Sequence, residues 1–179
     1  MVDYDLAELV ERVKKRDMLA MKILYKNSSN AMMTLSRRIT QNQAESEDIL
    51  QEAYMKSFER ISSLADPKTY YAWLKRIVIN DSLTAVKKKR HFKEIDFVEI
   101  EIEPVEESWF QKVPMKEIKK AIMSLPHGSR EVFTLYLMEG YKHREIAEML
   151  NISLSNSKSQ YQYALKLLRK KLEKFKINR

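Results

Sequence analysis

The 179-residue sequence has no cysteine and only two glycines, Gly128 and Gly140. Without cysteine the chain forms no disulfide, iron–sulfur cluster or cysteine-ligated zinc site, and it suits a reducing compartment. Two isolated glycines cannot build the glycine-rich loops that bind phosphates or dinucleotides. No stretch approaches the roughly 18 consecutive apolar residues of a membrane span. The first residues include four acids (Asp3, Asp5, Glu8 and Glu11), unlike a secretory signal peptide. We therefore expect a soluble, cytoplasmic protein without membrane insertion.

Turn-forming residues are scarce, since the chain has four prolines, and long stretches are rich in Leu, Lys, Glu, Met, Ala and Ile. This composition favours helices. Apolar residues recur every three or four positions, which predicts helices over 6–13, 19–39 and 44–61. Asp66 and Pro67 suit the N-cap and first position of a fourth helix, which continues toward Lys87. Further helices are expected over 118–125, from Ser129 to Gly140, and after His143. The predicted fold class is all-α.

Charge divides the chain into three parts. Residues 1–91 have 17 basic and 12 acidic residues, residues 92–113 have 2 and 7, and residues 114–179 have 14 and 6. The acidic segment alternates apolar and acidic residues, but no second strand is available to pair with it, so we expect an extended linker. Two small helical domains, 1–91 and 114–179, are therefore predicted, joined by the acidic linker 92–113. Basic domains suit a polyanion such as nucleic acid, although a generic lysine-rich surface explains the composition equally well.

Residues 143–171 have the pattern of a helix-turn-helix. Ile146, Ala147 and Leu150 line one face of a short helix, and Ala147 is small enough for a close crossing of two helices. Asn151 tolerates the left-handed conformation of a tight turn, and a longer helix follows from about Leu154. Short polar and cationic side chains near its start face outward, at the part that enters a DNA major groove. An ordinary helical hairpin with a polar face is the alternative.

The motifs of this segment resemble the C-terminal DNA-binding domain of bacterial sigma factors. The matching residues are Leu125-Pro126, Arg130-Glu131, Gly140, Glu145-Ile146-Ala147 and Lys158-Ser159. In the first domain, AESEDILQEAYMKSF is similar to the family's polymerase-binding helix, and TYYAWLKRIVIN with KKKRH is similar to its promoter-melting and minus-ten segment. Both motifs occur in order, with no long domain between them, which indicates the extracytoplasmic-function (ECF) group.

The resemblance implies a sigma factor that binds core RNA polymerase and directs promoter recognition. The implied polymerase-binding residues are Glu45, Asp48, Ile49, Gln51 and Glu52. The implied minus-ten DNA-binding residues are Ser62, Lys68, Tyr70, Lys75, Arg76, Asn80, Lys87, Lys88, Lys89 and Arg90. The implied minus-thirty-five residues are Arg144, Ser155, Asn156, Lys158, Ser159 and Gln162, with Ser155 expected to cap its helix. Whether an anti-sigma factor also binds is left open.

Two aromatic residues near the minus-ten segment, Tyr70 and Tyr71, could stack on bases, whereas Trp73 lies on the apolar stripe and is expected in the core. Four positions depart from the family pattern and leave the promoter sequence open. Asp81 lies on the expected core face, where members usually have an uncharged residue. The other three departures are Thr84, Ser157 and Tyr163.

No catalytic or metal site is predicted. The three histidines are far apart in sequence, and no nucleophile–base pair or carboxylate dyad stands out. We expect recruitment rather than catalysis, with no cofactor. Two other classes of protein remain open: an autonomous helix-turn-helix regulator whose first domain senses or dimerises, and a helical adaptor that binds only proteins.

Overall fold

The computed structural model describes residues 5–87 and 113–175, which are almost entirely helical and contain no strand. The chain divides between Lys88 and Lys89 into two compact units. The linker expected over 92–113 lies outside the described residues except for Val113, which is buried in the core of the second unit. None of the described helices is long and apolar enough to cross a membrane. The all-α prediction is confirmed for the described part of the chain.

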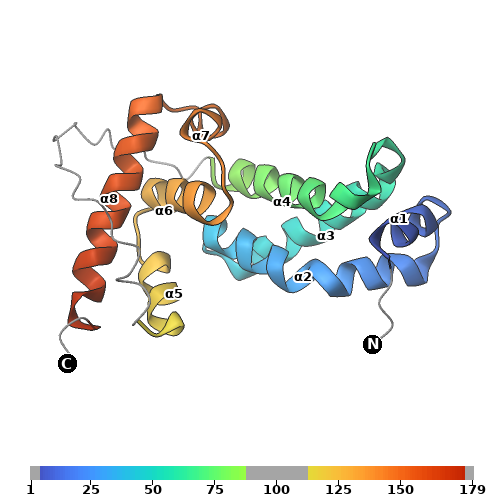
Figure 1. The fold of residues 1–179 in the computed structure, drawn as a ribbon, viewed down its shortest axis with the longest axis horizontal. Helices are drawn as coiled ribbons and strands as arrows, with labels where there is room; N and C mark the ends of the chain where they lie inside the picture. Colours follow the sequence, from blue (N-terminus) through green and yellow to red (C-terminus); the bar gives the residue numbers. More distant parts are fainter. Residues whose placement is uncertain (1–4, 88–112, 176–179) are drawn as a thin grey trace. The chain divides into compact units, whose positions relative to one another are not determined.

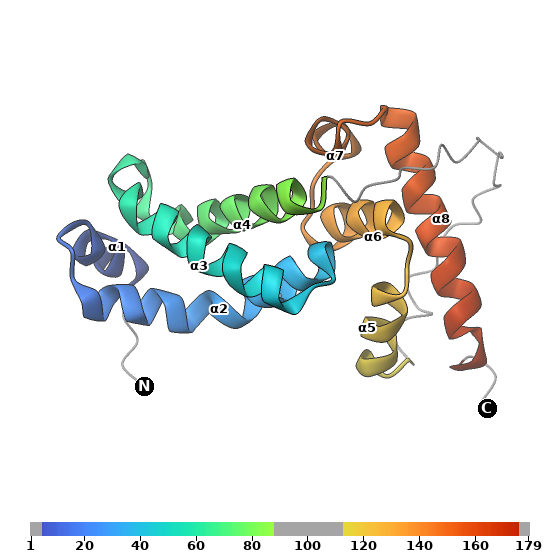
Figure 2. The ribbon, with the colours of Figure 1, turned by 180° about the vertical axis from the view of Figure 1, so that it is seen from behind.

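The N-terminal unit contains four α-helices (Figure 1), which are α1 (Leu6–Lys14), α2 (Met18–Thr40), α3 (Gln43–Glu59) and α4 (Tyr70–Val86). Helices α2, α3 and α4 pack against one another, and α1 packs on α2. The same packing is visible from behind in Figure 2. Their apolar faces form one core around Leu24, Ala53, Tyr54, Leu74 and Val78.

The connections of this unit follow from capping residues. Asp17 caps α2 by accepting hydrogen bonds from the backbone N–H groups of Leu19 (2.8 Å) and Ala20 (3.2 Å). Gln41 ends α2 in the left-handed conformation (φ 55°), and the Asn42 side chain caps α3. The short turn at Gln41 and Asn42 places α3 antiparallel to α2.

The start of the fourth helix differs from the prediction. Asp66 is an N-cap, as expected, but the turn that it caps is a separate 3₁₀ turn, Pro67–Thr69. The Asp66 carboxylate accepts from the backbone N–H of Lys68 at 3.0 Å. Helix α4 then begins at Tyr70, and another 3₁₀ turn, Ile61–Ser63, follows α3. The loop between α3 and α4 is thus built from two tight turns.

The C-terminal unit contains α5 (Met115–Met123), α6 (His127–Phe133), α7 (His143–Leu150) and α8 (Leu154–Leu172). A π-helical turn, Thr134–Met138, continues α6. Helix α8 packs against α5, α6 and α7, and its buried leucines complete the core. Helix α6 begins at His127, two residues before the expected Ser129, with Pro126 at the N-cap position and Gly128 inside the first turn. Gly140 follows with a φ of +78°, a conformation that glycine adopts at little cost.

The turn between α7 and α8 confirms the predicted helix-turn-helix. Asn151 is left-handed (φ 54°), and the backbone N–H of Ile152 donates to the Ala147 carbonyl at 3.0 Å. Ser153 then caps α8 by accepting from the Asn156 N–H at 3.0 Å. Ser155, which was expected to cap this helix, is therefore not its N-cap.

Candidate nucleic-acid and protein interfaces

Helix α3 presents an acidic face. Asp48, Gln51 and Glu52 are exposed, and Glu45 is half-buried. Ile49 points the other way and is buried among core residues, so its assignment as a polymerase contact is wrong. The position of Ile49 is explained by helical spacing, because it precedes the buried Ala53 by one turn. The exposed acids remain the candidate protein-binding residues of this helix.

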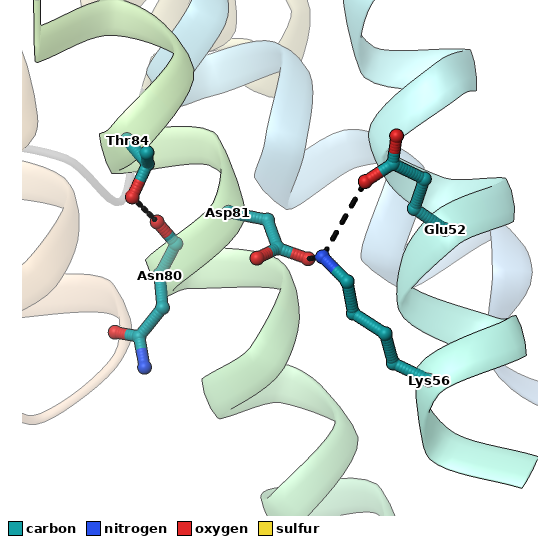
Figure 3. A network of polar contacts seen from close by, with 5 residues as sticks. All are labelled: Glu52, Lys56, Asn80, Asp81 and Thr84. Carbon is teal, nitrogen blue, oxygen red and sulfur yellow. Dashed lines mark hydrogen bonds and ion pairs between the residues drawn. The ribbon is translucent and has the colours of Figure 1, made fainter. Parts of the chain in front are cut away.

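A polar network joins this face to helix α4 (Figure 3). The Lys56 ammonium of α3 lies 3.0 Å from Asp81 Oδ2 in α4 and 3.4 Å from Glu52 Oε2 in its own helix. The hydrogen bond to Asp81 is the main reason that the pKa of Lys56 is raised. Asp81, which the sequence placed on the core side, therefore lies at the α3–α4 interface with a cationic partner. Sequence analysis missed Lys56, since nothing local relates it to a residue 25 positions away.

Most of the candidate DNA-binding residues in and just after α4 are exposed to solvent. Arg76, Asn80 and Lys87 are exposed, and Lys75 is half-buried. In Figure 3 the Asn80 amide points away from α3, while Thr84 donates its hydroxyl to the Asn80 carbonyl at 2.8 Å. Arg76 and Asn80 are one helical turn apart and Lys87, at the C-cap of α4, follows two turns after Asn80, so the three lie along one side of the helix. Lys88, Lys89 and Arg90 lie outside the described residues.

Tyr70 does not belong to this surface. Its side chain is fully buried, and its hydroxyl lies 3.2 Å from the Ser57 hydroxyl. Burial also raises the pKa of the Tyr70 phenol well above its ordinary value. Stacking on a base would require Tyr70 to leave the core, so the assignment is wrong. Tyr71 and Trp73 are half-buried against the same core, as expected for Trp73.

The loop between α3 and α4 has exposed residues held on a fixed frame. Ser62 and Lys68 are exposed, while Ile61 and Leu64 are buried beneath them. The Thr69 hydroxyl donates to the Asp66 carbonyl at 2.7 Å. This arrangement fixes the loop backbone and leaves both predicted DNA-binding residues accessible.

The N-terminal part of α8 presents a mainly polar surface. Ser155 and Lys158 are exposed, as is Arg144 of α7, whereas Ser159 and Gln162 are half-buried. Asn156 is also half-buried, and its Oδ1 atom is enclosed with no hydrogen-bond partner among the described residues. The amide oxygen is therefore not accessible in this conformation of the Asn156 side chain. All six predicted residues lie on the two helices that meet at the turn.

An aromatic cluster holds α7 against α8. The His143 ring stacks on Tyr136 with ring centroids 4.2 Å apart, and Tyr161 of α8 lies 4.7 Å from Tyr136. His143 Nδ1 also lies 2.9 Å from the Ser157 hydroxyl. Burial, assisted by the charge of Lys158, lowers the pKa of His143. Sequence analysis missed this cluster because its members lie on three separate elements.

Arg130 supports α6 from within the core. Its side chain is fully buried, donates to the Leu125 carbonyl at 2.7 Å and lies 3.0 Å from His127 Nδ1. Burial lowers the pKa of Arg130 to about 10, partly opposed by Glu131. Arg130 belongs to the motif that resembles the sigma-factor family, but its burial and its hydrogen bonds show that it stabilises the fold.

Comparison with known proteins assigns both units to one family. Residues 24–92 match Sigma-70 region 2, and residues 115–168 match Sigma-70 region 4. The chain belongs to the sigma-70 family. Within it, the relatives indicate an ECF sigma factor, as the sequence motifs implied. Sigma factors are DNA-binding transcription initiation factors rather than enzymes.

Similar proteins extend this assignment. The ECF RNA polymerase sigma-E factor of Escherichia coli K12 is 26% identical over 165 residues, which cover 85% of this chain and 86% of that protein. The "Probable RNA polymerase sigma factor RfaY" of Xanthomonas campestris pv. campestris is 30% identical over 132 residues, 69% of this chain but only 33% of that protein. The chain thus aligns with about a third of the Xanthomonas relative and with most of the E. coli one.

A solved structure shares the fold. The sigma factor RpoE from Bartonella quintana, solved with the anti-sigma factor NepR, has a TM-score of 0.53 and 23% identity. The match covers 88% of this chain and 98% of the Bartonella chain.

Proposed function

We propose that this sigma factor binds core RNA polymerase through the acidic face of α3 and holds the minus-ten element through α4 and the preceding loop. Helix α8 then recognises the minus-thirty-five element in the major groove. The observation that supports this most is the separation of charge and polarity: exposed acids on α3, an exposed Arg–Asn–Lys stripe on α4, and polar side chains at the start of α8. Each surface has the chemistry of its proposed partner.

The α3 face suits a basic protein partner. Asp48 and Glu52 are exposed one helical turn apart, and the opposite side of the helix is buried, so the acids are presented on a rigid support. Charge complementarity at such a surface increases both association rate and specificity. Core polymerase works in the cytoplasm, so the proposed function implies that this chain acts there.

The α8 face suits duplex DNA. Lys158 supplies a positive charge for a phosphate, whereas the amides of Gln162 and Asn156 match the donor–acceptor pattern of a base edge. The cap at Ser153 and the aromatic cluster around His143 fix the start of this helix. An anti-sigma factor is a further partner to test, since the Bartonella relative was solved with one.

Two other classes were open from the sequence, an autonomous regulator and a protein-binding adaptor. Family matches in both units do not favour either. Mobility shift of genomic promoter fragments separates the three. We expect a specific shift only when core polymerase and this protein are both present. A regulator would bind duplex DNA alone, usually as a dimer, and an adaptor would leave the core–DNA pattern unchanged.

A further inference from the structure

The charges of α3 and α4 are sorted by sign with one exception in each helix. Helix α3 contains five acids, and Lys56 is its single base. Helix α4 contains Lys75 and Arg76, and Asp81 is its single acid. The two exceptions contact each other across the helix interface at 3.0 Å (Figure 3).

Position determines what each exception would do without its partner. Lys56 is already paired with Glu52 at 3.4 Å, and Asp81, at 3.0 Å, shares its charge, so without Asp81 the whole ammonium charge would be left to that acid of the proposed polymerase-binding face. Asp81 points toward α3, whereas the Asn80 side chain beside it points away, but both belong to the helix proposed to face DNA, so an unpaired carboxylate would add an uncompensated negative charge to that helix. Each group therefore opposes the function of its own helix and is neutralised by the other.

We infer that Lys56 and Asp81 are positioning residues whose pairing keeps the α3 face acidic for polymerase and the α4 face free of negative charge for DNA. This inference rests on the proposed function. Folding stability alone does not account for the pair. The side chains of Lys56 and Asp81 remain 38% and 25% exposed, and ion pairs with this access to water contribute little to stability.

The inference predicts opposite defects for the two single variants. Lys56→Met leaves Asp81 unpaired on α4, so DNA binding by the assembled holoenzyme falls by about fivefold, at the lower end of coupling between sites. Binding of the variant to core polymerase is unchanged or tighter, because Glu52 loses a competing cation. Asp81→Asn releases Lys56 toward Glu52, so binding to core polymerase weakens by about fivefold while DNA binding by saturated holoenzyme is retained. The double variant restores both affinities.

The experiment measures two affinities for each full-length variant. Core binding is followed by fluorescence anisotropy of the labelled chain. DNA binding is measured with saturating core on a promoter fragment from which the wild-type holoenzyme transcribes, at two salt concentrations. Lys22→Met of α2 and Glu8→Gln of α1 are matched controls, because each makes the same charge change at an exposed position elsewhere in the N-terminal unit. Neither control is expected to change either affinity.

Crossed single-variant defects, with recovery in the double variant, support the inference. It is overturned if both singles weaken both affinities alike, if the double variant is no better than the singles, or if neither single changes either affinity. Thermal unfolding identifies any variant that fails because it misfolds, and Lys56→Gln then replaces Lys56→Met. If the wild-type chain directs no transcription from any fragment, the proposed function fails first, and the inference fails with it.

Discussion

His143, in the first turn of α7, places its Nδ1 atom 2.9 Å from the hydroxyl of Ser157 in α8. The same ring stacks on Tyr136, so one titratable side chain connects three elements of the helix-turn-helix unit. Its lowered pKa means that the folded protein disfavours the imidazolium form. The packing of the proposed recognition helix is therefore sensitive to acid.

The sign of the pH effect follows from this shift. Between the lowered folded pKa and the ordinary value of 6.5, the unfolded chain binds more protons than the folded one, so stability falls as pH falls through that window. Well above 6.5, where His143 is neutral in both states, it contributes no pH dependence. We expect the protection factors of the α7 and α8 amides, which compare observed exchange with the intrinsic rate at the same pH, to fall on acidification in the wild type. His143→Phe keeps a ring beside Tyr136 and should show a smaller fall, and an equal fall in both proteins would contradict the assignment.

Tyr70 provides a test of the corrected minus-ten surface. Tyr70→Phe removes the hydrogen bond to Ser57 and should lower the free energy of unfolding by about 1 kcal/mol. It should leave DNA binding by the holoenzyme unchanged, because the hydroxyl that is removed is bonded to Ser57 inside the core and does not contact DNA. Urea unfolding and DNA titration measure the two effects. Ser57→Ala removes the same contact from the other side, together with the hydrogen bond that Ser57 donates to the Tyr54 carbonyl at 2.8 Å, and should be destabilised at least as much. Weaker DNA binding at unchanged stability would return Tyr70 to the interface.

The acidic face of α3 is tested by charge reversal. Asp48→Arg with Glu52→Arg should abolish association with core polymerase, because bringing like charges together at such an interface costs several kcal/mol. Both side chains are exposed, so the helical circular dichroism should be unchanged. Asp5→Arg with Glu8→Arg makes the same change in net charge at α1 and should still bind. Retention of polymerase by the α3 variant in a pull-down would remove this docking assignment.

Helix α8 should divide its contacts between phosphates and bases. Lys158→Ala should weaken promoter binding by the holoenzyme similarly at all minus-thirty-five sequences and reduce the salt slope by about 1. Gln162→Ala should cost about 1–3 kcal/mol on the preferred sequence and relax the choice of base, with little change in salt slope. Titrations on matched and mismatched promoters at two salt concentrations distinguish them. If neither variant changes transcription at any promoter, α8 is not the recognition helix.

Local patterns were sufficient for much of the fold. The helices follow from apolar spacing, and the turn of the helix-turn-helix follows from Asn151, because each depends on neighbours in sequence. Tyr70 and Ile49 were misassigned despite an available signal. Tyr70 precedes the buried Leu74 and Val78 by one and two helical turns, which places it on the core stripe.

Side-chain contacts between different helices could not be predicted from the sequence. Asp81 was expected on the core face, but its pairing with Lys56 depends on how α3 packs against α4. The stack of His143 on Tyr136 similarly depends on the π-helical turn after α6 and the glycine that follows it. Such pairs are determined by the packing of helices that are far apart in sequence. No short spacing of residues in a single sequence predicts that packing.

Run-off transcription by core polymerase on the organism's own promoter fragments tests the central claim most directly. With this protein added, we expect discrete transcripts that core polymerase alone does not produce. The Asp48→Arg, Glu52→Arg variant should fail to produce them, while the Asp5→Arg, Glu8→Arg control should succeed. An identical transcript pattern with and without the protein, across fragments that cover the genome's promoters, would contradict its assignment as a sigma factor.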